Sequence, residues 1–250
     1  MGSVHGGARD LKFPPLIEGT LLRRYKRFLA DVRLEHGEVL TVHCPNSGSM
    51  KGCNRPNAPC WISDSNNPKR KLRYTLEAVE GSEGWICVHT GRPNGVVKEA
   101  LDAGLIPLEG GAITGIRSEV RYGRENSRID LLVEQSDGRT FLEVKGVSLA
   151  EGGLGLFPDA RTTRGEKHLR ELQSVVADGD RAALVFCLQR SDAQAVAAED
   201  QIDPSYAAAL TEARAAGVQV FALHNQIDRQ GISPTGLIPV LQHRQDFSRS

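Results

Sequence analysis

Two carboxylates and a lysine form the sharpest chemical pattern in the sequence. Asp130 closes the run Arg128-Ile129-Asp130, and the triplet Glu143-Val144-Lys145 begins thirteen residues later. Carboxylate oxygens are the ligands that Mg²⁺ and Mn²⁺ prefer, and a pair of them leaves positions for water and a phosphate group. A bound metal acidifies water, and a nearby lysine can orient that water or offset charge on the phosphate. The pattern predicts metal-dependent phosphodiester hydrolysis by Asp130, Glu143 and Lys145, with the two carboxylates as metal ligands.

The hairpin between these residues decides whether they meet. Asp137-Gly138 suits a two-residue turn, which would place Asp130 opposite Lys145. Side chains alternate between the two faces of a strand, so Asp130, Glu143 and Lys145 would then project from one face. A three-residue loop would separate Asp130 from the other two. The alternative explanation is a cross-strand Asp130–Lys145 salt bridge in a half-exposed hairpin, with no catalytic role.

The neighbours of this motif are apolar, which indicates two substantially buried strands. Buried ionisable groups without partners are costly, so burial favours a functional site. Two further carboxylates are candidate metal ligands: Glu99 on an expected helix, and Glu119 in the first strand of the sheet. Each is also explained as an exposed surface charge. Glu99 is the stronger candidate because a helix that precedes the sheet can lean over the site.

A second group of candidate residues lies on an expected helix over 162–178. Arg164, Lys167 and His168 are spaced at i, i+3 and i+4, which places them on one face near the helix N-terminus. Such a face suits phosphate binding. The alternative is an amphipathic helix whose polar face is basic.

The charge of the chain is balanced overall but unevenly distributed. Residues 1–90 contain 13 Lys+Arg and 9 Asp+Glu, whereas residues 91–250 contain 18 and 22. Basic residues grouped on one face can bind phosphodiesters in a protein with no net charge. The first cluster offers four candidate nucleic-acid contacts, Arg23, Arg24, Lys26 and Arg27, with Tyr25 or Phe28 to stack on a base. A second cluster occupies 69–73, and both are equally explained as solvated surface runs.

Strand alternation limits the first cluster. In one continuous strand, Arg24 and Lys26 would share one face while Arg23 and Arg27 would share the other. The four residues would therefore not all contact one ligand.

The elements that position these residues divide the chain in two. After a flexible tail or tag over 1–12, the pattern over 13–90 predicts an OB-like β-barrel with strands within 21–34, 38–44, 60–65, 71–80 and 85–90. Residues 91–250 alternate between strand and helix patterns, which predicts a mixed α/β domain. The expected helices cover 95–103, capped by Asn94, then 162–178 and 205–217.

Composition excludes several classes of protein. No apolar run reaches the roughly 18 to 20 residues that cross a bilayer, and the N-terminal residues lack the apolar core of a signal peptide. We therefore expect a cytoplasmic protein. The five cysteines have no paired spacing, which indicates reduced, partly buried thiols instead of disulfides or a zinc site. Both a monomer and a homodimer are compatible with the sequence.

Longer runs of sequence carry a resemblance to a known family. From about residue 13 to its end the chain resembles the sugar fermentation stimulation protein A family, in runs such as CPNSGSMKGC, SEVRYGRENSRIDLLVE, FLEVKGVSLA and FPDARTTRGEKHLREL. The resemblance implies an OB-like barrel followed by a domain similar to PD-(D/E)xK nucleases. Asp130, Glu143 and Lys145 then occupy the motif positions, with Ile129 where the motif has proline.

The resemblance also implies DNA binding and a role in regulating sugar-utilisation genes, such as those for maltose. Three functions therefore stand as hypotheses. The first is a Mg²⁺- or Mn²⁺-dependent nuclease that acts on DNA, with RNA as the alternative substrate. The second is a DNA-binding regulator without catalysis, and the third is a small-molecule binder that uses the loop over 46–50. The filled motif positions favour the nuclease.

Overall fold

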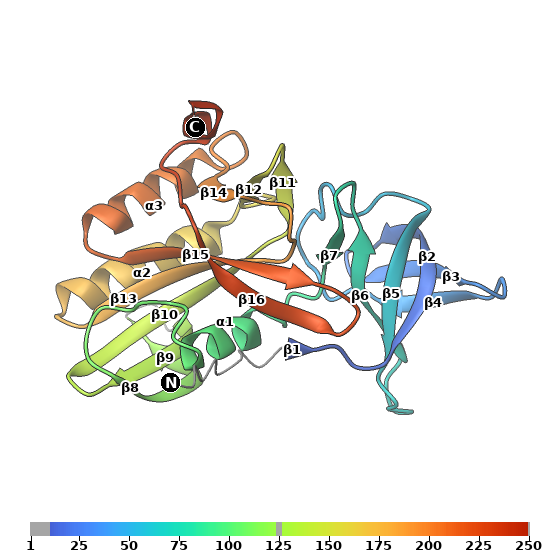
Figure 1. Cartoon of the computed structure of the whole chain (residues 1–250), viewed down its shortest axis with the longest axis horizontal. Coiled ribbons are helices and arrows are strands. Elements are labelled where there is room, and N and C mark those ends of the chain that lie inside the picture. The colour runs from blue at the N-terminus through green and yellow to red at the C-terminus, as the bar shows by residue number, and fades with distance from the viewer. Residues whose placement is uncertain (1–10, 124–126, 250) are drawn as a thin grey trace, which may run out of the picture.

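A five-stranded barrel forms the N-terminal part of the protein. The computed structural model describes residues 11–123 and 127–249, and the barrel occupies the right-hand side of Figure 1. Its strands are β2 (Leu16–Tyr25), β3 (Leu29–Leu34), β4 (Val39–His43), β5 (Ala58–Asp64) and β6 (Tyr74–Glu80). They follow the order β4-β3-β2-β5-β6, and a pairing of His43 with Thr75 closes the barrel. The predicted OB-type architecture is confirmed, with β7 (Trp85–Cys87) paired to β6.

The first predicted strand of the barrel is two strands joined by a tight turn. The expected strand over 21–34 breaks after Tyr25, where Lys26 and Arg27 adopt φ angles of 48° and 62°. Positive φ at two successive residues reverses the chain, so β2 pairs antiparallel with β3. The basic cluster therefore lies partly on a strand and partly in a turn.

A seven-stranded mixed sheet forms the C-terminal part. Its order is β1-β16-β15-β13-β10-β9-β8, with β10, β13 and β15 parallel to one another. The bounds are β1 (Leu11–Lys12), β8 (Ile113–Tyr122), β9 (Ser127–Gln135), β10 (Gly138–Val147), β13 (Arg181–Leu188), β15 (Gln219–Ile227) and β16 (Gly231–Ile238). The mixed α/β class is as predicted. The expected tail over 1–12 differs at its end, because Leu11 and Lys12 pair with β16, and residues 1–10 lie outside the described residues.

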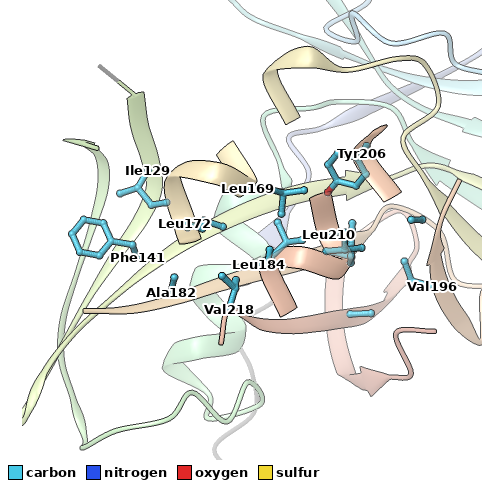
Figure 2. Packing of buried hydrophobic residues seen from close by; sticks show 14 of the residues in the cluster. Ile129, Phe141, Leu169, Leu172, Ala182, Leu184, Val196, Tyr206, Leu210 and Val218 are labelled. Carbon is cyan, nitrogen blue, oxygen red and sulfur yellow. The ribbon is translucent and has the colours of Figure 1, made fainter. Parts of the chain in front are cut away.

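Helices cover both faces of this sheet. Helix α1 (Pro93–Asp102) packs on one face, and α2 (Thr163–Ala177) and α3 (Pro204–Ala215) pack on the other. Figure 2 shows Leu169 and Leu172 of α2 and Leu210 of α3 against Leu184 of β13. The next residue of that strand, Val185, belongs to the core under α1, as strand alternation requires.

The starts of the helices follow local signals in two of three cases. Thr162 caps α2 by accepting a hydrogen bond from the Gly165 amide at 3.0 Å, and Asp203 caps α3. Helix α1 differs from the prediction because it begins at Pro93, after Arg92, which makes no side-chain cap. Asn94, the expected cap, lies inside the first turn, where its side chain is available for another contact.

The barrel and the α/β sheet share a core. Trp61 of β5 stacks on Trp85 of β7 at 3.6 Å between ring centroids, and Trp61 belongs to the same apolar cluster as Val96 of α1. A buried ion pair between Arg92 and Glu77, 2.9 Å long, joins the start of α1 to β6. These contacts fix the barrel against the domain that carries the motif residues.

The remaining elements form a small sheet beside α3. It consists of β11 (Leu149–Glu151), β12 (Leu154–Phe157) and β14 (Ala195–Ala198), followed later by a 3₁₀ helix, η1 (Arg244–Arg249). All five cysteines are free and buried, as predicted. Among the described residues, no helix is both long enough and apolar enough to cross a membrane.

Candidate functional site

The β9–β10 hairpin brings the motif residues together in a register that differs from the prediction. Leu132 pairs with Phe141 and Leu131 with Leu142, so the turn is centred on Ser136-Asp137 and not on Asp137-Gly138. The expected pairing of Asp130 with Lys145 is therefore wrong by two residues. The cause is long-range, because the Asp137 carboxylate accepts hydrogen bonds from the Gly111 amide and from Arg181. The loop still has an even number of residues, so the parity of the strand is preserved.

Asp130 lies where the ladder between β9 and β10 ends. One carboxylate oxygen accepts a hydrogen bond from the Val144 amide at 2.8 Å, and the other accepts from the side chain of Asn94 at 3.0 Å. The carboxylate thus replaces a missing ladder bond and is tied to the first turn of α1. Burial and the nearby charge of Glu143 raise the pKa of Asp130 above its ordinary value, although these hydrogen bonds and Lys145 oppose the rise.

Glu143 is the most buried member of the motif, with 2% of its surface exposed. Its Oε1 accepts hydrogen bonds from Nζ of Lys145, at 2.6 Å, and from Nδ1 of His168. Burial pushes the pKa of Glu143 up, but Lys145 and His168 outweigh it and hold the pKa below its ordinary value. Its other oxygen, Oε2, is buried and has no hydrogen-bond partner among the described residues. An unpaired buried carboxylate oxygen costs several kcal/mol by order of magnitude, so this atom needs a partner.

A divalent cation fits this donor set. Oε2 of Glu143 is unpaired, and each oxygen of Asp130 keeps a lone pair after accepting one hydrogen bond. Hard oxygen donors of this kind suit Mg²⁺ or Mn²⁺. In the described part of the chain, however, no three His, Cys, Asp or Glu side chains form a group that could hold a metal. Waters or substrate oxygens would have to complete the coordination shell.

The geometry does not support Glu99 and Glu119 as further ligands. Glu99 is half-buried on α1, five residues and so about 7.5 Å along the helix axis beyond Asn94. Glu119 stands opposite Asp130 in the β8–β9 register, between the pairs formed by Ser118 and Val120. Its φ of 56° departs from strand geometry, however, and its side chain is exposed.

Lys145 connects the buried carboxylates to a cavity of about 430 Å³. The walls of this cavity include the barrel loop over 46–48 together with Arg27, and the segment over 156–162. Asn94 and Val144, which hold Asp130, also line it. A cavity of this size matches the sites that bind small ligands. Lys145 therefore lies at a hollow between the barrel and the α/β domain, and its ammonium group is hydrogen-bonded to the buried Glu143.

The walls of this cavity are fastened to each other. Oδ2 of Asp159 accepts a hydrogen bond from the Met50 amide at 3.0 Å, and the Asp159 carbonyl accepts one from the Ser49 hydroxyl at 2.8 Å. Gly48 is required beside them, because a Cβ at this position would lie 2.7 Å from the Asp159 carboxylate. Ser49 and Asp159 are 110 positions apart in the chain, so sequence patterns alone did not reveal their contact.

Comparison with known proteins places this architecture in a family. The N-terminal OB domain of SfsA matches residues 22–88, and the sugar fermentation stimulation protein RE domain matches residues 91–231. The chain belongs to the sugar fermentation stimulation protein family. A homolog from Teredinibacter turnerae is 54% identical over 230 residues, which cover 91% of this chain and 98% of that protein. A homolog from Geotalea uraniireducens is 53% identical over 226 residues, with coverage of 90% and 97%.

A solved structure of a family member has the same fold. The structure of Pyrococcus furiosus SfsA in complex with Ca²⁺ superposes with a TM-score of 0.83 at 30% sequence identity. The match covers 94% of this chain and 100% of that one. The two-part architecture is therefore shared across distant family members.

The basic residues of α2 have different environments. His168 is buried, with 5% of its surface exposed, and Nε2 of its ring accepts from Arg164 at 3.3 Å. It therefore orients Glu143. The sequence had placed it on a basic helix face suited to phosphate binding, and its burial differs from that expectation. Arg164 is exposed, while Lys167 is half-buried. Helical spacing correctly placed these residues on one face, but not how deeply that face is buried.

The basic residues of the barrel are also divided. Arg23 forms an ion pair with Asp31 at 2.8 Å, across the β2–β3 ladder. Arg24 donates to the backbone carbonyls of Asn46 and Gly48 at 2.8 and 2.9 Å, so it supports the cavity loop. Of this cluster, Arg27 lines the cavity. Membership of the family does not by itself show which of these arginines lines the cavity and which is held by other contacts.

Three residues at the site were not identified from the sequence. Asn94 was assigned to a helix cap, whereas Asp159 and Arg161 of the FPDAR segment were not singled out. The sequence did contain one signal for Asp159 and Arg161. Both lie in FPDARTTRGEKHLREL, one of the runs that resemble the family. Their proximity to the barrel loop depends on how the two parts of the family fold pack together.

Proposed function

We propose that this protein is a metal-dependent nuclease that hydrolyses phosphodiester bonds in DNA, with Mg²⁺ or Mn²⁺ as its cofactor. The observation that carries the proposal is the buried, unpaired Oε2 of Glu143 beside Asp130 and Lys145, the last of which lines a cavity. A family member has been solved in complex with Ca²⁺, a cation that also takes oxygen ligands. Two carboxylates and a lysine at a hollow suit phosphoryl chemistry better than they suit a structural role.

Each residue has a task that follows from its contacts. Asp130 and Glu143 would hold the cation, which supplies positive charge to acidify water and offset charge on the phosphate. Asn94 and the Val144 amide orient Asp130, and His168 orients Glu143. Lys145 would donate a hydrogen bond from Nζ to a phosphate oxygen or to the attacking water. Because its ammonium group is already held 2.6 Å from Glu143, it loses little freedom on binding.

A cleavage assay tests this proposal. Purified protein is incubated with single-stranded, duplex and branched DNA and with RNA, each in Mg²⁺, Mn²⁺ or EDTA. We expect metal-dependent cutting that is reduced at least about 100-fold in Asp130→Asn and in Lys145→Ala, with nucleic-acid binding retained. Asp102→Asn, which removes an exposed carboxylate from α1, is the matched control and should cut like the wild type.

A second function follows from a separate observation. Since the described residues contain no group of three metal-ligating side chains, a DNA-binding regulator of sugar-utilisation genes that lacks catalysis is the alternative. It predicts firm DNA binding without cutting under every metal condition. Cutting that persists unchanged in both variants would contradict the assignment of Asp130 and Lys145.

A further inference from the structure

A strained turn lies at the mouth of the cavity. Lys26 and Arg27 both have positive φ, a region that residues with a Cβ rarely adopt and that Asn and Gly adopt with less strain. Asn-Gly is the usual choice where two successive residues need positive φ. Local strain persists where surrounding structure and function require the side chains. Lys26 and Arg27 are therefore candidates for a role that Asn-Gly would not fulfil.

One arginine holds this turn against the cavity wall. Nε of Arg24 donates to the Arg27 carbonyl at 3.2 Å, and the same guanidinium donates to the carbonyls of Asn46 and Gly48. The Cys44 amide donates to the Phe28 carbonyl at 2.9 Å, which joins the end of the turn to the start of the same loop. The turn and the loop thus move as a unit, and both Arg27 and the loop line the cavity.

The turn presents positive charge and an aromatic ring together. Arg27 and Arg161 both line the cavity, and within the described ranges neither guanidinium is paired with a carboxylate. Phe28, beside Arg27, is 47% exposed, which is unusual for a phenylalanine. Basic groups that follow a backbone and an aromatic ring on which a base stacks are the two parts of a single-strand binding site.

The size of the cavity suits a single nucleotide unit. Its volume of about 430 Å³ falls in the range of sites for single small ligands, and hydrogen bonds from Ser49 and Met50 to Asp159 hold its walls together. A base-paired duplex offers no unpaired base to stack on Phe28. An unpaired strand can enter as a single backbone.

We propose that Lys26, Arg27 and Phe28, together with the cavity, bind a single-stranded segment of nucleic acid and guide it to Lys145. The inference rests on the proposed nuclease function and specifies its substrate class, an unpaired strand or end. DNA and RNA strands share the chemistry that this site recognises, namely a phosphate backbone and an unpaired base. A comparison of oligothymidine with oligouridine distinguishes a DNA strand from an RNA strand.

The test measures binding in EDTA, where cutting does not interfere. Fluorescent oligothymidine, oligouridine and a blunt DNA duplex are titrated with the full-length protein, and we expect the oligothymidine to bind at least about tenfold tighter than the duplex. The double variant Lys26→Asn/Arg27→Gly should weaken strand binding about tenfold or more and reduce the salt slope by about 1.4. It should also keep or raise Tm by about 2–4 °C, because the strain is relieved.

A charge-matched control separates this site from general attraction. Lys69→Gln/Lys71→Gln removes two positive charges from the other basic cluster, away from the cavity, and should change strand binding little. Phe28→Ala should weaken strand binding about tenfold through lost stacking. Tighter binding of oligouridine than of oligothymidine would support the site and identify RNA as the strand.

Several results would overturn the inference. These are equal losses in the two double variants, duplex binding as tight as strand binding, or displacement of the strand by an equal concentration of free thymidine monophosphate. The proposed nuclease function fails separately. If the turn variants lose strand binding but the wild type never cuts, the binding site stands and the nuclease does not. If the wild type cuts and the turn variants bind and cut equally well, the nuclease function stands and the proposed strand-binding site does not.

Discussion

His168 donates a hydrogen bond to Oε1 of Glu143, the same oxygen that accepts from Lys145. Both protein contacts thus fall on one carboxylate oxygen and leave Oε2 without a partner among the described residues. Because Nε2 of His168 accepts from Arg164, the ring is held as the tautomer that carries its proton on Nδ1. A helix residue therefore orients the carboxylate while one of its oxygens stays available.

This relationship predicts that His168 is a positioning residue. His168→Ala should lower Mn²⁺ affinity and kcat for cleavage by about 10- to 100-fold, while KM for the nucleic acid changes little. His168→Asn should restore much of the loss, since the Asn amide can donate from nearly the same place as Nδ1. Mn²⁺ titration calorimetry measures the first effect. Wild-type Mn²⁺ affinity in His168→Ala would contradict the assignment.

The contact between Asp159 and the barrel loop predicts a measurable contribution to stability. Asp159→Ala removes the acceptor of the Met50 amide, so we expect the free energy of unfolding to fall by about 1–2 kcal/mol. Urea unfolding at pH 7 measures this loss. Asp200→Ala, which removes an exposed carboxylate, is the control and should change stability by less than about 0.5 kcal/mol. Equal stabilities of the two variants would argue against the fastened cavity.

Asp31 predicts a pH dependence of barrel stability. Burial tends to raise the pKa of this carboxyl, but hydrogen bonds from Arg23, Thr41 and Tyr25 outweigh it and lower the pKa. A lowered folded-state pKa gives stabilisation that is present at pH 7 and is lost as pH falls below about 3.9.

Urea titrations of the wild type and Asp31→Asn test this dependence. The difference in unfolding free energy should be present at pH 7 and shrink as the solution is acidified. Glu35→Gln, an exposed carboxylate change in the same barrel, is the control. A difference that grew on acidification would contradict the assigned sign.

The cysteines predict slow thiol chemistry in the folded protein. Burial raises the pKa of Cys53, Cys60, Cys87 and Cys187 to about 12, and it also raises the pKa of Cys44. Few thiolates exist at pH 8, and the sulfurs are covered. An aromatic disulfide reagent should therefore label the native protein slowly and all five thiols rapidly in guanidinium chloride. A rapidly labelled native thiol would contradict this expectation.

Local signals in the sequence were sufficient for much of the fold. Short apolar strands with turn residues between them predicted the barrel, and the strand and helix periods predicted a mixed α/β domain. The start of α2 agrees with the expected helix over 162–178, because the capping hydrogen bond of Thr162 forms within one turn. These features succeed because their free energies depend on neighbours a few residues apart.

The arrangement of Asp130, Glu143 and Lys145 was predictable in part. The even hairpin loop kept Asp130 on the same face as Glu143 and Lys145, as expected, because the relative parity of the two strands depends only on the number of residues in the loop. The register itself slipped by two residues, because Arg181, 44 positions away from Asp137, helps to hold the turn. A distant partner of this kind leaves no periodic signal in the sequence.

The residue types and their spacing determined which chemistry we propose for this protein, and the tertiary structure decided which of these residues lie together. The sequence indicated that His168 and Arg24 were surface basic residues. In the structure, His168 contacts Glu143 and Arg24 contacts loop carbonyls. Two walls of the cavity are joined where Asp159 meets a loop more than 100 positions away. Such contacts depend on how whole layers pack, and burial then decides whether a charge binds a ligand or holds its neighbour.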